Sequence, residues 1–221
     1  MKKILIFVIS FLVLHNTNIE ARMYEPLEVR NFVNSIDANN EKNLTTLTRT
    51  LIRPFDNDYN KAQAIAYWIA SRITYNSYLY NNGEATKLLR SYKVQSGNEL
   101  IESRFGICGD YANLFLEMTQ KAKISAKKIT GYVYSREDRF NKYATSHAWN
   151  SFRYKGKDIY VDTTFMSKSA VEIQGRGGNL QQKRSAKEIK KAKSINRYDP
   201  YYFDFTYKSE KKLKNKTREE K

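Results

Sequence analysis

Apolar residues in the first half of the chain recur at the spacing of helices. After Asn57 the repeat predicts a helix packed on a core, and its apolar positions are Ala62, Ile65, Ile69 and Ile73. Asp56 or Asp58 stands where a cap for its first turn is expected. Residues 22–57 carry scattered apolar positions up to Arg53-Pro54, which favours one or two short amphipathic helices.

A second core helix is predicted to begin at or just after Cys108. Its apolar face is formed by Ala112, Phe115, Met118 and Ala122. The stretch before it, from Asn81 to Gly97, is polar and rich in turn residues, which indicates a loop that could border a cleft.

The pattern changes to alternation in the second half of the chain. Lys127 to Ser135 predicts a strand, and Thr145 to Thr164 predicts two strands joined by a turn at Lys155-Gly156. Helices therefore come first and an antiparallel sheet follows. This order predicts the α+β class, with N-terminal helices packed on the sheet.

The N-terminus has the pattern of a secretory signal peptide. Two lysines precede an apolar stretch from Ile4 to Leu14, and Ala21 stands where a signal peptidase could cut. The stretch is too short for a membrane-spanning helix, which needs about 20 residues, and no later segment is apolar enough. Residues 1–21 are therefore set apart, although an uncleaved anchor is the alternative.

The remaining 200 residues suit a single domain. Residues 22–57 are expected to form a helical extension and residues 58–207 the main domain. The aromatic-rich stretch from Tyr198 to Tyr207 predicts a closing strand, or alternatively a docking patch for a partner or glycan. Residues 208–221 are expected to be a disordered basic tail.

The chain is strongly basic, with 39 Lys and Arg against 23 Asp and Glu. Removing Lys2, Lys3 and Glu20 with the signal peptide changes the net charge only from +16 to +15. Such a charge favours anionic partners. For an exported protein these are cell-envelope polymers, lipid head groups or acidic proteins before nucleic acid, and the basic segment from Lys183 to Lys193 is a solvated helix or a binding face.

Cys108 is the only cysteine, so the chain has no internal disulfide. A thiol at a helix N-terminus has a lowered pKa, and the flanking Gly106 and Gly109 would let a substrate approach the backbone, whose N–H groups could form an oxyanion hole. The plainer alternative is a small buried core residue.

His147 is the only imidazole once His15 leaves with the signal peptide, so any histidine base is this residue. A two-residue turn at Lys155-Gly156 would pair Trp149 with Asp162 and His147 with Thr164. His147 and Asp162 would then be diagonal neighbours, close enough for a hydrogen bond. A bulge at the turn would instead put Asp162 on the other face, and a structural role is the alternative for both residues.

Several separated motifs resemble the core of the transglutaminase-like superfamily. They are Arg104-Phe105-Gly106-Ile107-Cys108-Gly109-Asp110-Tyr111-Ala112, Ile129-Thr130-Gly131-Tyr132-Val133, Ser146-His147-Ala148-Trp149-Asn150 and Tyr160-Val161-Asp162. The resemblance covers about Lys61 to Phe165. It departs from the family pattern at Thr163-Thr164-Phe165, where a small residue or proline usually precedes the aromatic.

The resemblance implies a papain-like fold with a catalytic triad of Cys108, His147 and Asp162, no metal and no cofactor. Tyr75 is the position that would correspond to an upstream aromatic residue assisting the oxyanion. The implied function is a secreted or periplasmic bacterial cysteine hydrolase, a peptidase or amidase, acting on a peptide or protein through a thioester. Transglutaminase-type crosslinking and a non-enzymatic protein that binds anionic envelope ligands are the alternatives.

Overall fold

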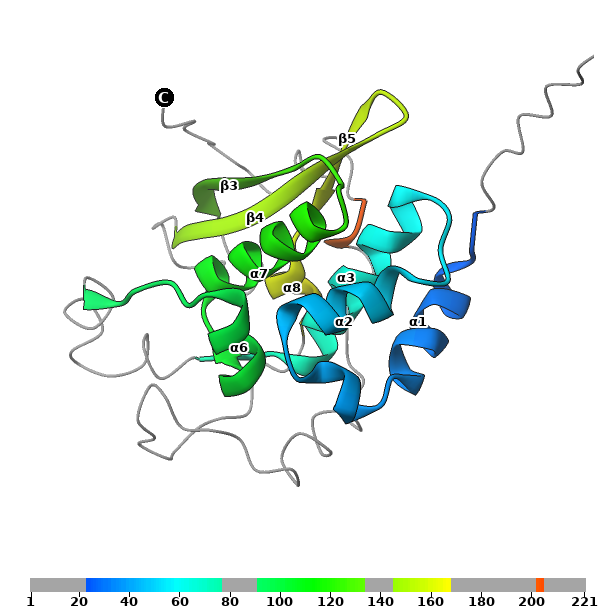
Figure 1. The fold of residues 1–221 in the computed structure, drawn as a ribbon. Coiled ribbons are helices and arrows are strands. Elements are labelled where there is room, and N and C mark those ends of the chain that lie inside the picture. Colours follow the sequence, from blue (N-terminus) through cyan, green and yellow to red (C-terminus); the bar gives the residue numbers. More distant parts are fainter. Residues whose placement is uncertain (1–22, 77–90, 134–144, 168–201, 205–221) are drawn as a thin grey trace, which may run out of the picture.

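The computed structural model describes residues 23–76, 91–133, 145–167 and 202–204, and these form an α+β fold in which helices cover one side of a sheet (Figure 1). The predicted fold class is confirmed. The N-terminal stretch 1–21, the basic segment 183–193 and the tail 208–221 lie outside the described residues.

The helical elements are α1 (Pro26–Ser35), the 3-10 helix η1 (Ala38–Glu41), α2 (Leu44–Ile52), α3 (Asp58–Arg72), α6 (Gly97–Ser103), α7 (Cys108–Lys121) and α8 (Thr163–Met166). The strands are β1 (Thr74–Tyr75), β2 (Phe105–Gly106), β3 (Ala126–Val133), β4 (Thr145–Tyr154) and β5 (Lys157–Val161).

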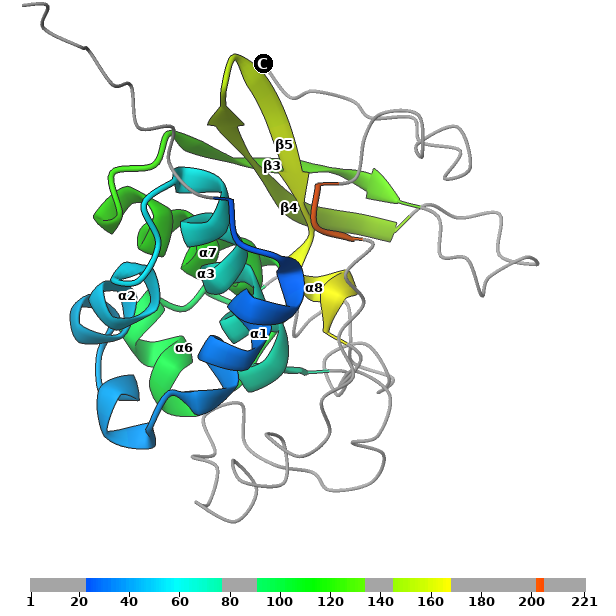
Figure 2. The same cartoon turned by 90° about the vertical axis from the view of Figure 1, so that its right-hand side faces the viewer.

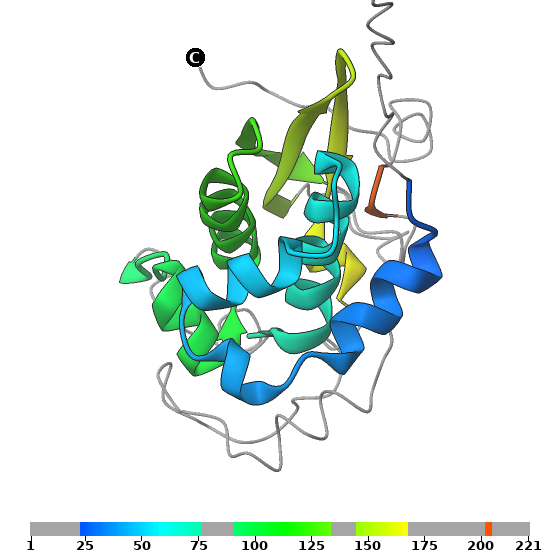
Figure 3. The same cartoon turned by 45° about the vertical axis from the view of Figure 1, so that its right-hand side comes forward.

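Helix α3 is the centre of the helical layer. Every residue from Ala62 to Ala70 is buried, because α1, α2 and α7 all pack against the helix (Figure 3). The predicted cap at Asp56 or Asp58 is wrong. Asn57 has the extended backbone of a capping residue, and its side-chain oxygen accepts the N–H of Asn60 at 2.8 Å, so Asp58 becomes the first helical residue.

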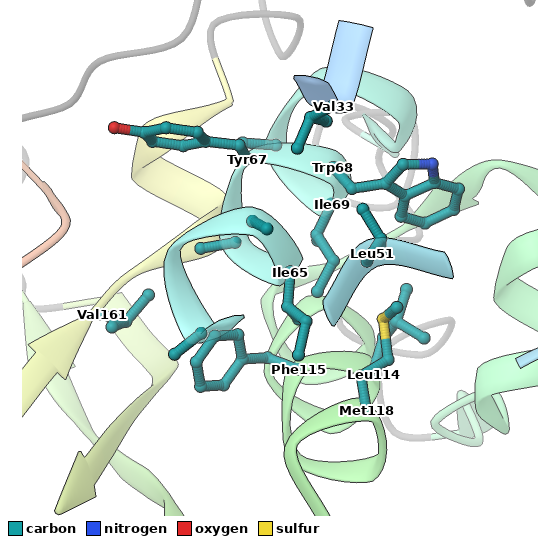
Figure 4. Packing of buried hydrophobic residues seen from close by; sticks show 14 of the residues in the cluster. Val33, Leu51, Ile65, Tyr67, Trp68, Ile69, Leu114, Phe115, Met118 and Val161 are labelled. Atoms are coloured by element: carbon teal, nitrogen blue, oxygen red, sulfur yellow. The ribbon is translucent and has the colours of Figure 1, made fainter. Parts of the chain in front are cut away.

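The N-terminal region contains the two α-helices α1 and α2, in line with the one or two helices that its scattered apolar pattern predicts, and the short 3-10 helix η1 between them. Val33 of α1 and Leu51 of α2 lie in the same buried cluster as Trp68 of α3 and Phe115 of α7 (Figure 4). Each of these four side chains is at most 1% exposed, so the helices share one continuous core. Leaving large apolar side chains without these neighbours would expose them to water, at about 1.5–3 kcal/mol for each side chain.

The three-stranded sheet has the order β3-β4-β5, and both pairs are antiparallel. Tyr154 pairs with Lys157, so the register predicted from the two-residue turn is confirmed. The prediction that the last strand continues to Thr164 is wrong. The strand ends at Val161, and the side chain of Asp162 accepts the N–H of Phe165, which caps helix α8 instead.

Two short parallel strands, β1 and β2, were not predicted. Thr74 pairs with Phe105 and Tyr75 with Gly106, so the chain that leaves α3 lies beside the chain that enters α7. The carbonyl of Arg104, whose backbone is left-handed at φ 61°, accepts the N–H of Thr74 at 2.9 Å. Because Tyr75 pairs with Gly106, it lies beside the chain two residues before Cys108.

A buried charge cluster holds this junction to the helices. Glu41 accepts hydrogen bonds from Trp68 at 3.1 Å, from Arg72 at 3.3 Å and from Arg104 at 3.0 Å, and the Arg104 guanidinium lies over the Trp68 ring. Burial lowers the pKa of Arg72, an effect that Glu41 opposes. A buried carboxylate with such partners is costly to remove, because its partners would remain as buried charges.

Residues 202–204 lie along the free edge of β5 (Figure 2). Phe203 forms an antiparallel bridge with Val161 and is 7% exposed. In this part of the predicted closing strand only Phe203 pairs with the sheet, because Tyr202 lies in a 3-10 turn and Asp204 is left-handed at φ 57°. The rest of the stretch from Tyr198 to Tyr207 lies outside the described residues. No helix in the described part of the chain is long and apolar enough to cross a membrane.

Candidate active site

Cys108 is the first residue of α7 and is 8% exposed. The preceding residue, Ile107, is extended and forms the N-cap of the helix. The first N–H groups of a helix have no partner within the helix, and they concentrate its positive end there. The thiol therefore lies where the backbone favours a negative charge.

His147 lies on β4, the central strand, opposite Gly131 of β3. Its imidazole stacks on Phe165 with ring centroids 4.5 Å apart and on Trp149 with centroids 5.9 Å apart. Both ring pairs are close to parallel, at 14° and 20°. These contacts restrict the ring plane of a side chain that is only 6% exposed.

Asp162 follows the last residue of β5 and uses both of its carboxylate oxygens. One oxygen, Oδ2, lies 2.7 Å from Nε2 of His147, and the other, Oδ1, accepts the N–H of Phe165 at 2.9 Å. The carboxylate is thereby fixed between the sheet and α8. Because Asp162 occupies Nε2, the imidazole presents Nδ1 to its other neighbour.

That other neighbour is the Cys108 thiol, which is hydrogen-bonded to His147. Burial raises the pKa of the thiol, but the hydrogen bond and charge of His147 and the N–H of Ala148 outweigh burial, and the pKa of Cys108 is lowered. Burial lowers the pKa of His147, whereas Asp162 and Cys108 raise it, to about 10 in all. Opposite shifts of this kind favour a thiolate beside an imidazolium.

The structure thus brings together the three side chains that the sequence singled out, from α7, β4 and the end of β5. Cys108 can act as a nucleophile, His147 can donate and accept a proton, and the Asp162 carboxylate can orient the imidazole. Tyr75 packs against the small cluster of Cys108, Ala112 and Ala148, so it also lies at this site. Within residues 23–76, 91–133 and 145–167, no group of carboxylates, imidazoles or thiols is arranged to hold a metal ion.

Sequence analysis missed a second polar network around the start of α7. Asp110 is fully buried and accepts hydrogen bonds from the Tyr92 hydroxyl at 2.5 Å, from the N–H of Gln95 at 2.7 Å and from the N–H of Ile107 at 2.7 Å. Burial raises the pKa of Asp110, and these hydrogen bonds oppose the effect. The network fastens segment 92–95 to the turn that delivers Cys108.

Two glycines beside Cys108 differ in the space around them. A Cβ on Gly106 would lie 2.8 Å from Cβ of Asp110 and 2.8 Å from Cδ1 of Leu100, so no side chain fits. A Cβ on Gly109 would meet only Cγ2 of Val94, at 3.3 Å. The close approach of β2 to α7 therefore requires glycine at position 106.

Two solved structures resemble the chain over part of their length. One is a candidate cysteine protease from Cytophaga hutchinsonii, with 26% identity, a TM-score of 0.42, and coverage of 55% of this chain and 36% of that chain. The other is described as a TGase, with 15% identity, a TM-score of 0.36, and coverage of 78% of this chain and 39% of that chain. The chain thus spans less than two-fifths of either protein. No curated protein matches it.

The sequence profile of the transglutaminase-like superfamily matches residues 45–163. This range begins in α2, includes α3, α7 and the whole β3-β4-β5 sheet, and contains Cys108, His147 and Asp162. It covers more than half of the 221 residues, and it confirms the resemblance carried by the separate motifs. The chain belongs to the transglutaminase-like superfamily.

Proposed function

We propose that the protein is an exported cysteine hydrolase that cleaves amide bonds of a peptide or protein through a thioester. The observation that carries the proposal is the chain of contacts from Cys108 through His147 to Asp162, with the pKa of the thiol lowered and that of the imidazole raised. A lowered thiol pKa supplies thiolate near neutral pH, and the thiolate is the reactive form of cysteine.

In the first half of the reaction, the Cys108 thiolate attacks the carbonyl carbon of the amide. The C–N bond then breaks, and the His147 imidazolium gives its proton to the departing amine. In the second half, neutral His147 takes a proton from water as the oxygen of that water attacks the thioester. The acid leaves, and the thiolate and imidazolium are restored. Asp162 holds the ring in one orientation throughout.

The negative oxygen formed in each half needs hydrogen-bond donors. The N–H groups at the start of α7 point out of the helix end beside Cys108 and are suited to this role. Tyr75 packs on the Cys108 cluster, which is consistent with the contribution that the family resemblance assigns to that position. Its proposed role is a donor or a dipole at the oxyanion.

Hydrolysis is proposed over crosslinking because a transamidating enzyme must shield its thioester from water and guide an amine to it. The sequence has no feature dedicated to an amine acceptor. The two outcomes are separable with a fluorescent primary amine. A hydrolase releases free acid and incorporates little of the amine, whereas a transamidase attaches the amine to the acyl donor.

The proposed site of action is outside the cytoplasm, in the periplasm or beyond the cell. The support is the lysine-then-apolar pattern of residues 1–21, which is typical of a secretory signal peptide. The direct test is N-terminal mass analysis of the protein recovered from a cell fraction. Cleavage after Ala21 would support export, and an intact Met1 on a cytosolic protein would contradict it.

The first experiment is the pH dependence of Cys108 alkylation by iodoacetamide, followed by intact mass. We expect an apparent pKa well below the free-thiol value of about 8.5. His147→Ala is expected to raise it above that value, because burial, the largest influence on the thiol, remains when the imidazole is gone. Ser146→Ala, at an exposed neighbouring position, is the matched control and is expected to behave as the wild type.

The second experiment tests hydrolysis on a mixture of peptides, with free carboxylates detected by mass spectrometry. Activity is expected in the wild type and in Ser146→Ala, and it is expected to be lost in Cys108→Ala. Cleavage that persists in Cys108→Ala, or a thiol pKa that does not respond to His147, would reject the proposal. The chain would then be better described as a binding protein for anionic ligands.

A further inference from the structure

We propose that Lys128 makes the site select substrates that carry a carboxylate next to the scissile amide. The inference rests on the proposed function and adds a substrate class to it. Lys128 lies on β3, opposite Asn150 of β4, on the side of the sheet that faces α7. Its ammonium donates a hydrogen bond to the carbonyl of Gly109 at 3.3 Å, one residue after Cys108.

The covalent path limits the distance between this ammonium and the nucleophile. Gly109 directly follows Cys108, so standard bond geometry places Nζ of Lys128 at most about 12 Å from the Cys108 sulfur. That limit is slightly longer than the Debye length of about 10 Å at 0.1 M salt and well within the Debye length of about 30 Å at 0.01 M salt, the low ionic strength at which the effect is expected. The charge of Lys128 therefore acts on an anion held at the thiol.

Lys128 has no carboxylate partner among the described residues, and its neighbour Lys127 shows the contrast. Lys127 is exposed and forms an ion pair with Asp158 at 3.8 Å, and Arg153 contacts the same carboxylate at 3.1 Å. Successive side chains of a strand point to opposite faces, so Lys127 and Lys128 face different surroundings. Only Lys128 faces α7.

The carboxylates nearest the site are already engaged. Asp162 is bonded to His147 and to the Phe165 N–H, and Asp110 accepts three hydrogen bonds in a fully buried position. Among the residues that the structure describes, no free anion would therefore compete with an incoming carboxylate for Lys128. The ammonium retains two N–H donors beyond the one given to Gly109.

An exposed apolar side chain, that of Val94, also lies next to Gly109. Val94 is 46% exposed, and its Cγ2 lies 3.3 Å from the position of a Cβ on Gly109. The N–H of the next residue, Gln95, is hydrogen-bonded to Asp110, which holds Val94 in position. A side chain with a methylene stem and a terminal carboxylate matches both features, so a glutamate-containing peptide is the substrate class indicated.

The test uses two reagents that differ in charge and react with the single cysteine. Iodoacetate is an anion and iodoacetamide is neutral, so the ratio of their rate constants at Cys108 measures selection for a carboxylate. At low ionic strength we expect Lys128→Gln to lower this ratio about two- to fourfold and Lys128→Glu to lower it further. Lys128→Arg is expected to keep the wild-type ratio, and 0.5 M NaCl is expected to reduce the differences.

The matched control is Lys127→Gln, which removes the same charge from the adjacent position on the other face. Its ratio is expected to equal that of the wild type. An unchanged ratio in Lys128→Gln and Lys128→Glu, or an equal fall in Lys127→Gln, would overturn the proposal. The ratio is independent of the thiol pKa, so failure of the carboxylate selection is distinguishable from failure of the proposed hydrolase, which would appear as an unshifted pKa.

Once a peptide substrate is known, the same variants give a second readout. We expect Lys128→Gln to lower kcat/KM for a peptide with glutamate beside the cleaved bond while sparing the peptide with glutamine there. Thermal unfolding of each variant separates this loss from unfolding. Equal losses on both peptides would indicate a structural role and contradict the proposal.

Discussion

Asp162 holds His147 and the first turn of α8 with a single carboxylate, 2.7 Å from Nε2 of the imidazole and 2.9 Å from the N–H of Phe165. The same phenylalanine stacks on the imidazole at 4.5 Å. The orientation of His147 is therefore coupled to the point at which the chain leaves the sheet.

Asp162→Asn separates the charge of this carboxylate from its capping role. The amide oxygen can still accept the Phe165 N–H, but the negative charge beside His147 is lost. We expect the pKa of His147 to fall, so that less imidazolium stands beside the thiol. This loss is expected to outweigh the direct effect of the Asp162 charge, which raises the pKa of Cys108, and to slow alkylation at pH 6 at least about tenfold, which corresponds to one pKa unit. Peptide hydrolysis is expected to fall by about 10²- to 10⁴-fold.

Alkylation and circular dichroism of Asp162→Asn test this expectation together. A folded variant with the wild-type rate of alkylation at pH 6 would show that Asp162 caps α8 and does not affect the ionisation of the thiol. Phe165→Leu is a useful companion, because it removes the ring stacking and keeps the carboxylate.

The stability of the chain should depend on pH through His147, and Cys108→Ala isolates this effect from thiol ionisation. The folded-state pKa of His147 is raised, to about 10 in the presence of the thiol, above its ordinary value of about 6.5. The folded state therefore holds the proton more tightly than the unfolded state. This stabilisation is fully present below about pH 6.5 and is lost as the pH rises through the folded-state pKa.

Urea unfolding of Cys108→Ala and of the double variant Cys108→Ala, His147→Gln checks this sign. The difference in unfolding free energy between the two is expected to be largest near pH 6 and to shrink steadily toward pH 10. A difference that grows with pH would mean that His147 is neutral in the folded protein.

Gly106→Ala is expected to disturb the junction between β2 and α7. Its Cβ would lie 2.8 Å from Cβ of Asp110, so the start of α7 must move. Overpacking of this kind costs about 1–3 kcal/mol, and displacement of Cys108 would slow alkylation at fixed pH. Gly109→Ala is the comparison, because it meets only the tip of Val94 at 3.3 Å. Equal unfolding free energies for the two variants would contradict the expectation.

Tyr92 and Asp110 are expected to be coupled in stability. Their hydrogen bond is 2.5 Å long and joins segment 92–95 to the turn before Cys108. A double-mutant cycle of Tyr92→Phe and Asp110→Asn is expected to give a coupling energy of about 0.5–3 kcal/mol. Tyr154→Phe, on the far hairpin, is the control partner for Asp110→Asn and is expected to give an additive result. Additivity in the Tyr92 cycle would show that Asp110 acts through its backbone partners alone.

Much of the fold could be predicted because local patterns and tertiary contacts agree in the long elements. The predicted apolar positions that lie within α3 and α7 are buried in the structure, whereas β4 is buried continuously from His147 to Phe152 and shows no alternation of burial. The turn at Lys155-Gly156 set the register of the β4-β5 hairpin correctly, since Gly156 has a φ of 78° and Lys155 a φ of 44°.

The missed features are short or depend on distant partners. Strands β1 and β2 have two residues each, too few for a period to be visible. Helix α6, which was not predicted, begins at the end of the predicted loop from Asn81 to Gly97, and it carries a capping box of Ser96 and Glu99 that is a recognisable sequence signal. The network of Asp110 joins residues 15 to 18 positions apart, which no local spacing reveals.

The bridge between Val161 and Phe203 ties residues 202–204 to the sheet and buries Phe203 in the core. Tyr202 accepts the N–H of Asp162 at 2.9 Å, Asp204 donates its N–H to Tyr160 at 2.9 Å, and the side chain of Asp204 accepts the Tyr59 hydroxyl at 2.9 Å. A shortened chain that stops at residue 163, where the family match ends, would lose these backbone partners and uncover the edge of β5. Affinity tags and fusion partners therefore belong beyond residue 204, and a minimal active fragment must include it.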